Sequence, residues 1–196
     1  SDGEAAVIDP LREPTPYIER AKKNKAKIKY IFETHIHADF VSGHLDLAKK
    51  TGATIVFGPN ANTHYDCYNA VDGETFKIGS LTLKVMHTPG HTLESVSYLL
   101  IDAAGKNHAL FSGDTLLLGD VGIPDVAQQY KGLSKEKIAE MLFDSLRSKI
   151  MPLEDNITLY PAHGAGSACG KNMSKDTIGT LGDQKSSNYA LRADMT

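Results

Sequence analysis

The sequence predicts an α+β fold in which two β-sheets pack together and helices cover them. Residues 5–57 alternate strand and helix patterns, whereas residues 81–111 carry β-rich runs separated by short turns, as hairpins do. A helix pattern over 134–149 and a strand pattern over 157–159 follow. At 196 residues the chain is long enough for one well-buried domain and short for two, so one domain over 1–196 is predicted.

The first elements are a strand, a helix and a second strand. Ala5–Ile8 is an apolar run that ends at Asp9-Pro10, and it predicts a strand. Thr15 is the expected N-cap of a helix from about Tyr17 to Asn24, with Pro16 at its first position. Ile28–Glu33 predicts the next strand.

A second helix and a short buried strand come next. Residues 41–50 predict a helix with Leu45 and Ala48 on one face. Gly52 is expected to end it, because glycine adopts the left-handed conformation of a C-cap without strain. Thr54–Phe57 predicts a buried strand.

The middle of the chain predicts hairpins. A short strand is expected around Phe76 and a longer one over Leu81–His87. Ser95–Ile101 and Lys106–Phe111 are expected to pair across the turn between them. Residues 116–130 lack clear periodicity and are a candidate active-site loop.

A strong amphipathic helix is predicted from Ser134 to about Lys149, and Pro152 stops it. Its apolar stripe consists of Ile138, Met141, Leu142, Leu146 and Ile150.

Composition excludes several classes of protein. The chain is 41% hydrophobic and 23% charged, with a net charge of −3, and it has no extended basic stretch of the kind that binds nucleic acid. No apolar run reaches the roughly 18 residues of a membrane span, and no signal-peptide pattern is present, so no membrane partner and a cytoplasmic location are predicted. The two cysteines, Cys67 and Cys169, favour a reducing compartment.

Both ends of the sequence suggest a piece of a longer polypeptide. Ser1–Glu4 resembles a hairpin turn that feeds the first strand, which predicts a partner strand upstream. Ala193–Thr196 ends the chain with no closing element. We therefore expect a fragment that lacks an N-terminal strand and one or more C-terminal domains.

Three metal-capable side chains alternate directly after the second strand. Because an extended backbone repeats every two residues, His35, His37 and Asp39 are expected to point the same way. Imidazole and carboxylate groups that converge at the end of a rigid strand favour a metal site. Satisfied polar residues at a strand end are the alternative.

Three later segments repeat this arrangement. His91, Asp114 and His163 each follow a β-rich run and a Gly or Pro. A lone His or Asp in such a place is more often a turn residue than a ligand. Four such strand exits together indicate a metal centre.

These motifs resemble those of the metallo-β-lactamase superfamily. The resemblance rests on H-x-H-x-D over 35–39, TPGHT over 88–92, the GD-type Asp114 and the late His163, in that order. It covers nearly all of the chain and implies the αββα sandwich of that superfamily.

Three further segments are similar to its persulfide dioxygenase branch, and most similar to bacterial members with C-terminal rhodanese domains. They are residues 120–125, 161–171 and 188–192. A covalently linked rhodanese domain is therefore a possible partner of this chain.

One position departs from the superfamily pattern. Phe40 stands where a second histidine usually follows the aspartate and helps to hold a second metal ion. Phenylalanine has no lone pair to donate, so a dinuclear hydrolytic centre is doubtful. In the dioxygenase branch the resemblance assigns one Fe(II) to His35, His91 and Asp114, a ligand set that leaves positions open for oxygen chemistry.

The remaining motif residues receive supporting roles from the same resemblance. Asp39 and His163 are expected to orient water and ligands. His37 would bind metal in the hydrolases and stand behind the ligands in the dioxygenases. Cys169, six residues beyond His163, either borders the metal pocket as a thiol for sulfane sulfur or is a small buried hydrophobe.

The predicted function is oxidation of a thiol persulfide with O2 to sulfite and thiol by a mononuclear iron dioxygenase. The alternative is a Zn(II) hydrolase of thioesters or lactams, similar to glyoxalase II, which lowers the pKa of bound water to roughly 7. A non-catalytic metal-binding or sulfur-carrier module is the third class. The thiol that carries the persulfide and the oligomeric state are not predicted.

Overall fold

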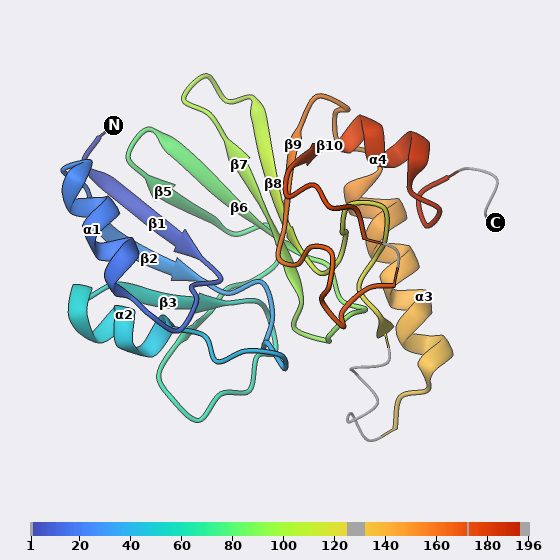
Figure 1. The fold of residues 1–196 in the computed structure, drawn as a ribbon, viewed down its shortest axis with the longest axis horizontal. Coiled ribbons are helices and arrows are strands. Elements are labelled where there is room, and N and C mark those ends of the chain that lie inside the picture. The colour runs from blue at the N-terminus through green and yellow to red at the C-terminus, as the bar shows by residue number, and fades with distance from the viewer. Residues whose placement is uncertain (1, 125–131, 172, 193–196) are drawn as a thin grey trace.

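The computed structural model of the chain describes residues 2–124, 132–171 and 173–192. Within these residues the strands form two sheets packed face to face, and a pair of helices lies outside each sheet (Figure 1). This is an αββα sandwich, so the predicted fold class is confirmed.

The first sheet is parallel and has the strand order β1-β2-β3-β4. Its strands are β1 (Glu4–Ile8), β2 (Lys27–Phe32), β3 (Thr54–Phe57) and β4 (Tyr68–Asn69). Apolar side chains of β2 and β3 are buried on both faces, as expected for inner parallel strands.

Helix α1 (Thr15–Lys23) covers this sheet, but its start differs from the prediction. Thr15 lies inside the helix rather than at its N-cap, which is Pro14 and has no side-chain cap. The Thr15 hydroxyl and backbone N–H both donate to Glu13 Oε1 (2.5 and 2.9 Å). Thr15 therefore braces the turn before the helix.

Helix α2 (His44–Thr51) begins three residues later than predicted. The Ser42 hydroxyl donates to Glu33 Oε1 (2.5 Å), and Gly43 N–H donates to Pro10 O (2.9 Å). This segment is therefore held by residues that follow β2 and β1 instead of by helical bonds. Gly52 ends the helix with φ +73°, as predicted.

The second sheet has the order β10-β9-β8-β7-β6-β5. Its strands are β5 (Thr75–Ile78), β6 (Leu81–His87), β7 (Val96–Ile101), β8 (Asn107–Gly113), β9 (Thr158–Pro161) and β10 (Gly179–Thr180). Strands β5 to β8 are antiparallel neighbours, whereas β8 and β9 run parallel. The predicted hairpin of β7 and β8 is confirmed.

Two helices cover the outer face of the second sheet. Helix α3 (Lys135–Ser145) begins at the predicted N-cap, because the Ser134 hydroxyl accepts from Lys137 N–H. It continues as a wider π-helical turn over Leu146–Ile150. Helix α4 (Leu181–Ser187) lies beside it (Figure 1).

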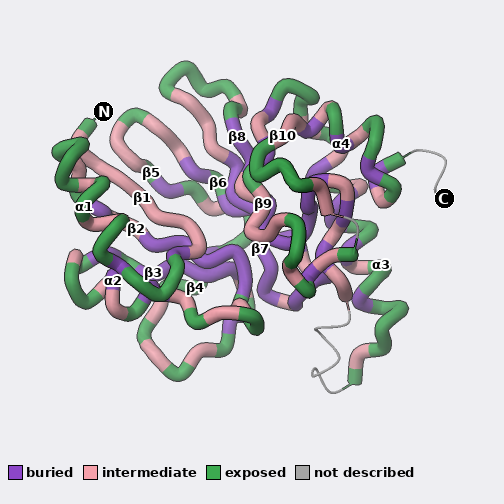
Figure 2. Tube along the Cα trace, viewed as in Figure 1, coloured by how far each residue is buried: buried purple, intermediate pink, exposed green. Residues whose placement is uncertain are grey.

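Buried hydrophobic residues form three clusters that match this architecture. Figure 2 shows buried residues concentrated along the strands in the middle of the molecule. Between α1–α2 and the first sheet lie residues such as Ile31 and Leu47. Between the two sheets lie Phe32, Tyr98 and their neighbours. The third cluster joins the second sheet to α3 and includes Leu142. Burial of this apolar surface is the main stabilisation of the sandwich.

Three short elements were not predicted from the sequence: β4, β10 and α4. Residues 125–130 of the predicted active-site loop, and Ala193–Thr196 at the end of the chain, lie outside the described residues. Among the described residues, no helix is both long and apolar enough to cross a membrane.

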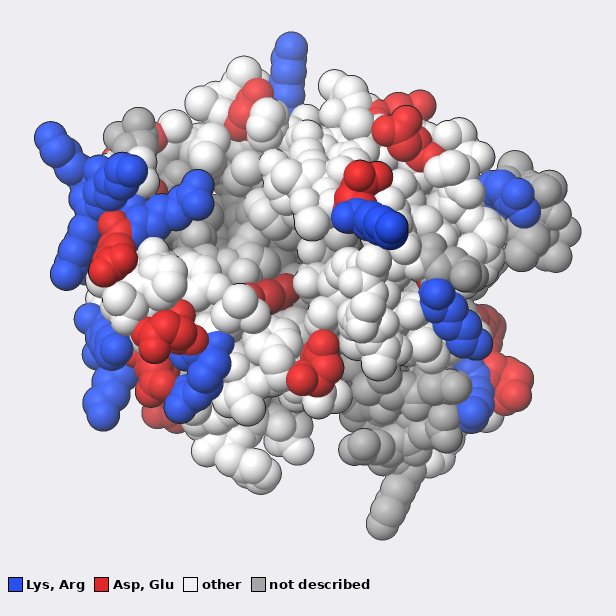
Figure 3. Space-filling model, in the orientation of Figure 1, with Lys and Arg blue, Asp and Glu red and all other residues white. Residues whose placement is uncertain are grey.

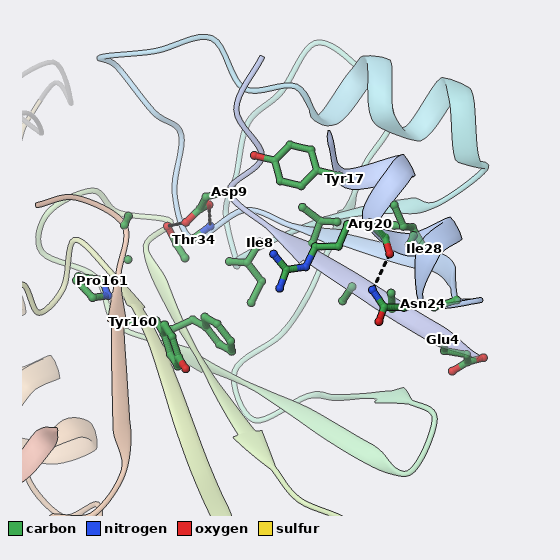
Figure 4. A pocket seen from close by; sticks show the side chains of 18 residues that line it. Glu4, Ile8, Asp9, Tyr17, Arg20, Asn24, Ile28, Thr34, Tyr160 and Pro161 are labelled. Carbon is green, nitrogen blue, oxygen red and sulfur yellow. Dashed lines mark hydrogen bonds between the residues drawn. The ribbon is translucent and has the colours of Figure 1, made fainter. Parts of the chain in front are cut away.

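A cavity of about 740 Å³ lies beside β1, between α1 and strands β8 and β9 (Figure 4). Tyr17 and Arg20 line it from α1, and Phe111 and Tyr160 line it from the second sheet. Strand β1 is an edge strand whose known partner is β2. A further strand upstream of Ser1 stays a prediction.

Charged side chains gather at one end of the molecule. Lysines and arginines cluster over α1, whose last turn carries Arg20, Lys22 and Lys23, while the middle of the same face has few of either sign (Figure 3). This is the solvated end of a helix.

Candidate metal centre

The topology brings the predicted ligand residues to one edge of the sandwich. Strands β6, β8 and β9 all run in one direction, so the residues that follow them meet at the same edge. These residues are His91, Asp114 and His163. His35 follows β2 of the other sheet, and its loop closes on β8 where Gly113 (φ +56°) meets Thr34. A Cβ on Gly113 would lie 2.7 Å from Thr34 Cβ, so the close approach requires glycine.

Hydrogen bonds fix which ring nitrogen of His35 carries a lone pair. The Thr34 hydroxyl donates to Asp9 Oδ2 (2.8 Å), so the same oxygen accepts from His35 Nδ1–H (2.9 Å). His35 Nε2 is then left with its lone pair. Burial, followed by the nearby charge of His37, holds the pKa of His35 well below its usual value. His35 is thus a neutral donor.

His91 is oriented in the same way. Its Nδ1–H donates to the carbonyl of Ile123 (2.9 Å), which can only accept, so Nε2 carries the lone pair. A carbonyl partner behind a ligating imidazole is the usual support of metal-binding histidines.

These two lone pairs converge on a carboxylate oxygen. Asp114 Oδ2 lies 3.3 Å from His91 Nε2 and 3.8 Å from His35 Nε2. Its side chain is 0% exposed, and Oδ2 has no hydrogen-bond partner among the described residues. Two buried imidazole nitrogens that both approach one unpaired carboxylate oxygen are unfavourable unless a cation is bound there. The donor set of two imidazoles and one carboxylate therefore fits a metal ion.

The other oxygen of Asp114 belongs to a separate chain of contacts. His163 Nδ1 lies 2.6 Å from Asp114 Oδ1, and His163 Nε2 lies 2.9 Å from Asp39 Oδ2. Burial disfavours the charged ring, yet hydrogen bonds to Asp114 and Cys169 outweigh it and raise the pKa of His163 to about 10. His163 is accordingly held between two carboxylates.

His37 is held between two other carboxylates. Its Nε2 lies 3.1 Å from Asp9 Oδ1 and 3.4 Å from Glu33 Oε2. Burial opposes the charged ring, but the close carboxylates of Asp9 and Glu33 raise the pKa of His37 to about 10. Both ring nitrogens are buried, and in the described part of the chain neither has a partner in hydrogen-bond geometry. Glu33 also accepts from His44 Nδ1 (2.9 Å), so His44 is a buried residue that supports the fold.

Phe40 lies against this group of histidines. Its ring centroid is 4.4 Å from that of His37 and 6.5 Å from that of His163. Where a metal-binding imidazole would offer nitrogen, an apolar ring fills the space.

Cys169 does border the metal site. Its Sγ lies within 4.8 Å of ligand atoms of His91 and Asp114, and the residue is 9% exposed. Hydrogen bonds to His163 and then His91 lower the pKa of the Cys169 thiol to about 7.

All six predicted motif residues therefore lie together: His35, His37, Asp39, His91, Asp114 and His163. The sequence reading missed the residues that hold them, above all Asp9, Glu33, Glu94 and Ile123. Glu94 is buried and accepts from Ile36 N–H (3.0 Å) in the metal loop. Asp9 follows a strand, just as the ligands do, and that signal could have found it.

Known proteins are similar to this chain in sequence and in fold. A model of the metallo-beta-lactamase superfamily matches residues 1–65. A hydroxyacylglutathione hydrolase of Rhodopseudomonas palustris (strain BisB5) is 30% identical over the whole chain, which covers 80% of that relative. The chain belongs to the metallo-β-lactamase superfamily. The superfamily assignment made from the motifs is thus confirmed.

Other members of the superfamily extend the comparison. A cytoplasmic hydroxyacylglutathione hydrolase of Arabidopsis thaliana is 32% identical over 83% of the chain, which spans 60% of that relative. A metallo-beta-lactamase structure from Staphylococcus aureus subsp. aureus COL has a TM-score of 0.88 and 39% identity over 98% of the chain, which spans 57% of it. The structure of ETHE1 from Myxococcus xanthus has a TM-score of 0.75 and 26% identity over 96% of this chain and 74% of its own.

Proposed function

We propose that the chain is the catalytic domain of a mononuclear non-haem Fe(II) enzyme that oxidises a thiol persulfide. The curated relatives named above are hydrolases, so the proposal rests on the site of this chain. Its activity, its thiol, a linked rhodanese domain and a cytoplasmic location are all parts of the proposal.

One observation supports the mononuclear centre most directly. Some of the ligand-type residues surround a single metal position, whereas the others form ion pairs with one another. His35 Nε2 and His91 Nε2 both approach Asp114 Oδ2. Asp39 and His163, which would help hold a second metal, bind each other and Asp114 Oδ1 instead. Phe40 then fills the place of the missing nitrogen ligand.

Two imidazoles and one carboxylate would hold Fe(II) and leave three of its roughly six positions for the persulfide sulfur and oxygen. When bound, iron supplies the oxygen chemistry and the protein supplies the geometry. His35 and His91 would be held in place by Thr34 and Ile123.

The proposed reaction is balanced as R–S–SH + O2 + H2O → R–SH + SO3²⁻ + 2 H⁺. The sulfur–sulfur bond breaks, the terminal sulfur is oxidised and O2 is reduced. His163 and Asp39 are the ionisable pair beside the centre. His163 is already charged between its two carboxylates, so Asp39, which is exposed, would accept the protons released and pass them to solvent. The product thiol leaves in its protonated form, R–SH.

A second candidate is a zinc hydrolase of thioesters, which the relatives favour. His37 Nδ1 is the observation that supports it within the site. The atom is buried and without a partner among the described residues, and its ring centroid is 4.1 Å from that of His35. A shift of this ring, with loss of its Nδ1 proton to solvent, would give a single zinc a third imidazole ligand.

Metal content separates the two candidates. Full-length protein purified without added metal is expected to contain one iron per chain, with anomalous scattering at His35, His91 and Asp114. Elemental analysis and diffraction at the iron and zinc edges would measure it. Two zinc ions per chain, with both positions occupied, would overturn the mononuclear proposal.

Restoring the missing imidazole tests the role of Phe40. Phe40→His is expected to raise the zinc bound per chain from one toward two when zinc is supplied, because Asp39, Asp114 and His163 already surround the position. Persulfide oxidation by the iron-loaded variant should persist. An unchanged zinc stoichiometry would show that Phe40 does not keep the site mononuclear. Phe143→His, at an exposed position on α3, is the matched control.

A further inference from the structure

Cys169 is fixed beside the metal centre by its backbone. Its N–H donates to Ser167 Oγ (3.1 Å), and its carbonyl accepts from Ile123 N–H (3.0 Å). Ile123 is the residue whose carbonyl orients His91. One segment thus positions both an imidazole ligand and a thiol.

The thiol lies beside a carboxylate, one oxygen of which lacks a hydrogen-bond partner among the described residues. Cys169 Sγ, a nitrogen of His91 and an oxygen of Asp114 all lie within 4.8 Å of one another. Asp114 Oδ2, fully buried and without a hydrogen-bond partner among the described residues, is aimed into the same space. His35 Nε2, 3.8 Å from that oxygen, is a further nitrogen donor.

We propose that Cys169 is a fourth protein ligand for zinc at this centre, together with His91, Asp114 and His35. The zinc–sulfur bond would replace the S–H bond, and the proton would leave to solvent. The inference depends on the proposed function only for the location of the metal.

Zinc and iron would then leave the centre with different numbers of open ligand positions. Zinc in protein sites is usually four-coordinate, and a site with four protein ligands is closed to substrate. Iron prefers about six ligands, so it keeps open positions whether or not the thiol binds. A zinc-loaded centre would therefore be closed to substrate, whereas an iron-loaded centre would stay open.

The chain offers a matched control in its other cysteine. Cys67 is part-buried, and its Sγ donates to Asn69 Oδ1 (3.3 Å), near β4 and away from the metal residues. Cys67→Ser removes a thiol from the same protein without touching the centre.

The test uses cobalt as a spectroscopic substitute for zinc in the metal-free full-length protein. Wild type and Cys67→Ser are expected to show near-ultraviolet thiolate-to-cobalt charge-transfer absorption. Cys169→Ser should lose this absorption but keep the visible cobalt bands, since His35, His91 and Asp114 remain. Competition with a chelator should show zinc affinity reduced at least about tenfold in Cys169→Ser, since loss of a supporting partner alone costs roughly 10–100-fold.

Two results would overturn the inference. One is wild-type protein with bound cobalt and no charge-transfer absorption, and the other is the same absorption in Cys169→Ser. Neither depends on whether the iron-loaded protein oxidises persulfides, so a failure of this inference is distinguishable from a failure of the proposed function.

Discussion

Asp114→Ala is expected to release the metal and to abolish persulfide oxidation. Asp114 Oδ2 supplies the only negative charge among the three proposed ligands, and the neutral rings of His35 and His91 do not balance a divalent cation. We expect metal affinity to fall by more than about 100-fold, because removal of supporting partners alone costs roughly 10–100-fold. Metal content after dialysis and oxygen uptake with a persulfide would measure the loss.

A second variant separates the charge from the shape of Asp114. Asp114→Asn keeps the side-chain volume and an acceptor for His163 Nδ1, but it removes the charge, so it should also lose the metal while its circular dichroism stays native. Asp144→Ala, at an exposed position on α3, is the control and should behave as wild type. Full metal retention by Asp114→Asn would show that Asp114 is not a ligand.

Gly90→Ala is expected to cause the largest loss of stability. Gly90 precedes the ligand His91 and has φ +144°, and a Cβ there would lie 2.3 Å from Leu142 Cβ and 2.4 Å from Leu142 Cα. Leu142 belongs to α3, so either the helix or the metal loop must move. Strain and overpacking together should lower the free energy of unfolding by roughly 3 kcal/mol or more.

Gly105→Ala isolates the effect of this contact. Gly105 also has a left-handed backbone (φ +80°), but a Cβ there meets nothing within 4 Å. It should cost only about 1 kcal/mol of backbone strain. Urea unfolding of the metal-free proteins would measure both values. Equal losses in the two variants would contradict the packing of α3 against the His91 loop.

Much of the fold could be predicted because its main strands are apolar runs bounded by turn residues. Strands β2, β3, β6, β7 and β8 all have this form, and the predicted layers followed from their order. The two-residue strands β4 and β10 could not be predicted, since Tyr68–Asn69 and Gly179–Thr180 become strands only through their partners β3 and β9.

The ligand residues could be predicted because each follows a strand end, whereas their supporting contacts could not. The pairing of His37 with Asp9 and Glu33 depends on β1 lying parallel to β2, a register that spacing does not reveal. The same holds for Ile123, whose backbone carbonyl rather than its side chain orients His91. Every residue has a backbone carbonyl, so the residue type does not reveal which carbonyl accepts a given hydrogen bond.

Oxygen uptake by iron-loaded full-length protein tests the central claim most directly. The account predicts that O2 is consumed only after a persulfide is added, and that sulfite accumulates with it one for one. The same preparation, and a zinc-loaded one, should be assayed for thioester hydrolysis. Substantial hydrolysis without persulfide-dependent oxygen uptake would contradict the account and favour the zinc hydrolase, and inactivity in both assays would contradict it in favour of a sulfur-carrier module.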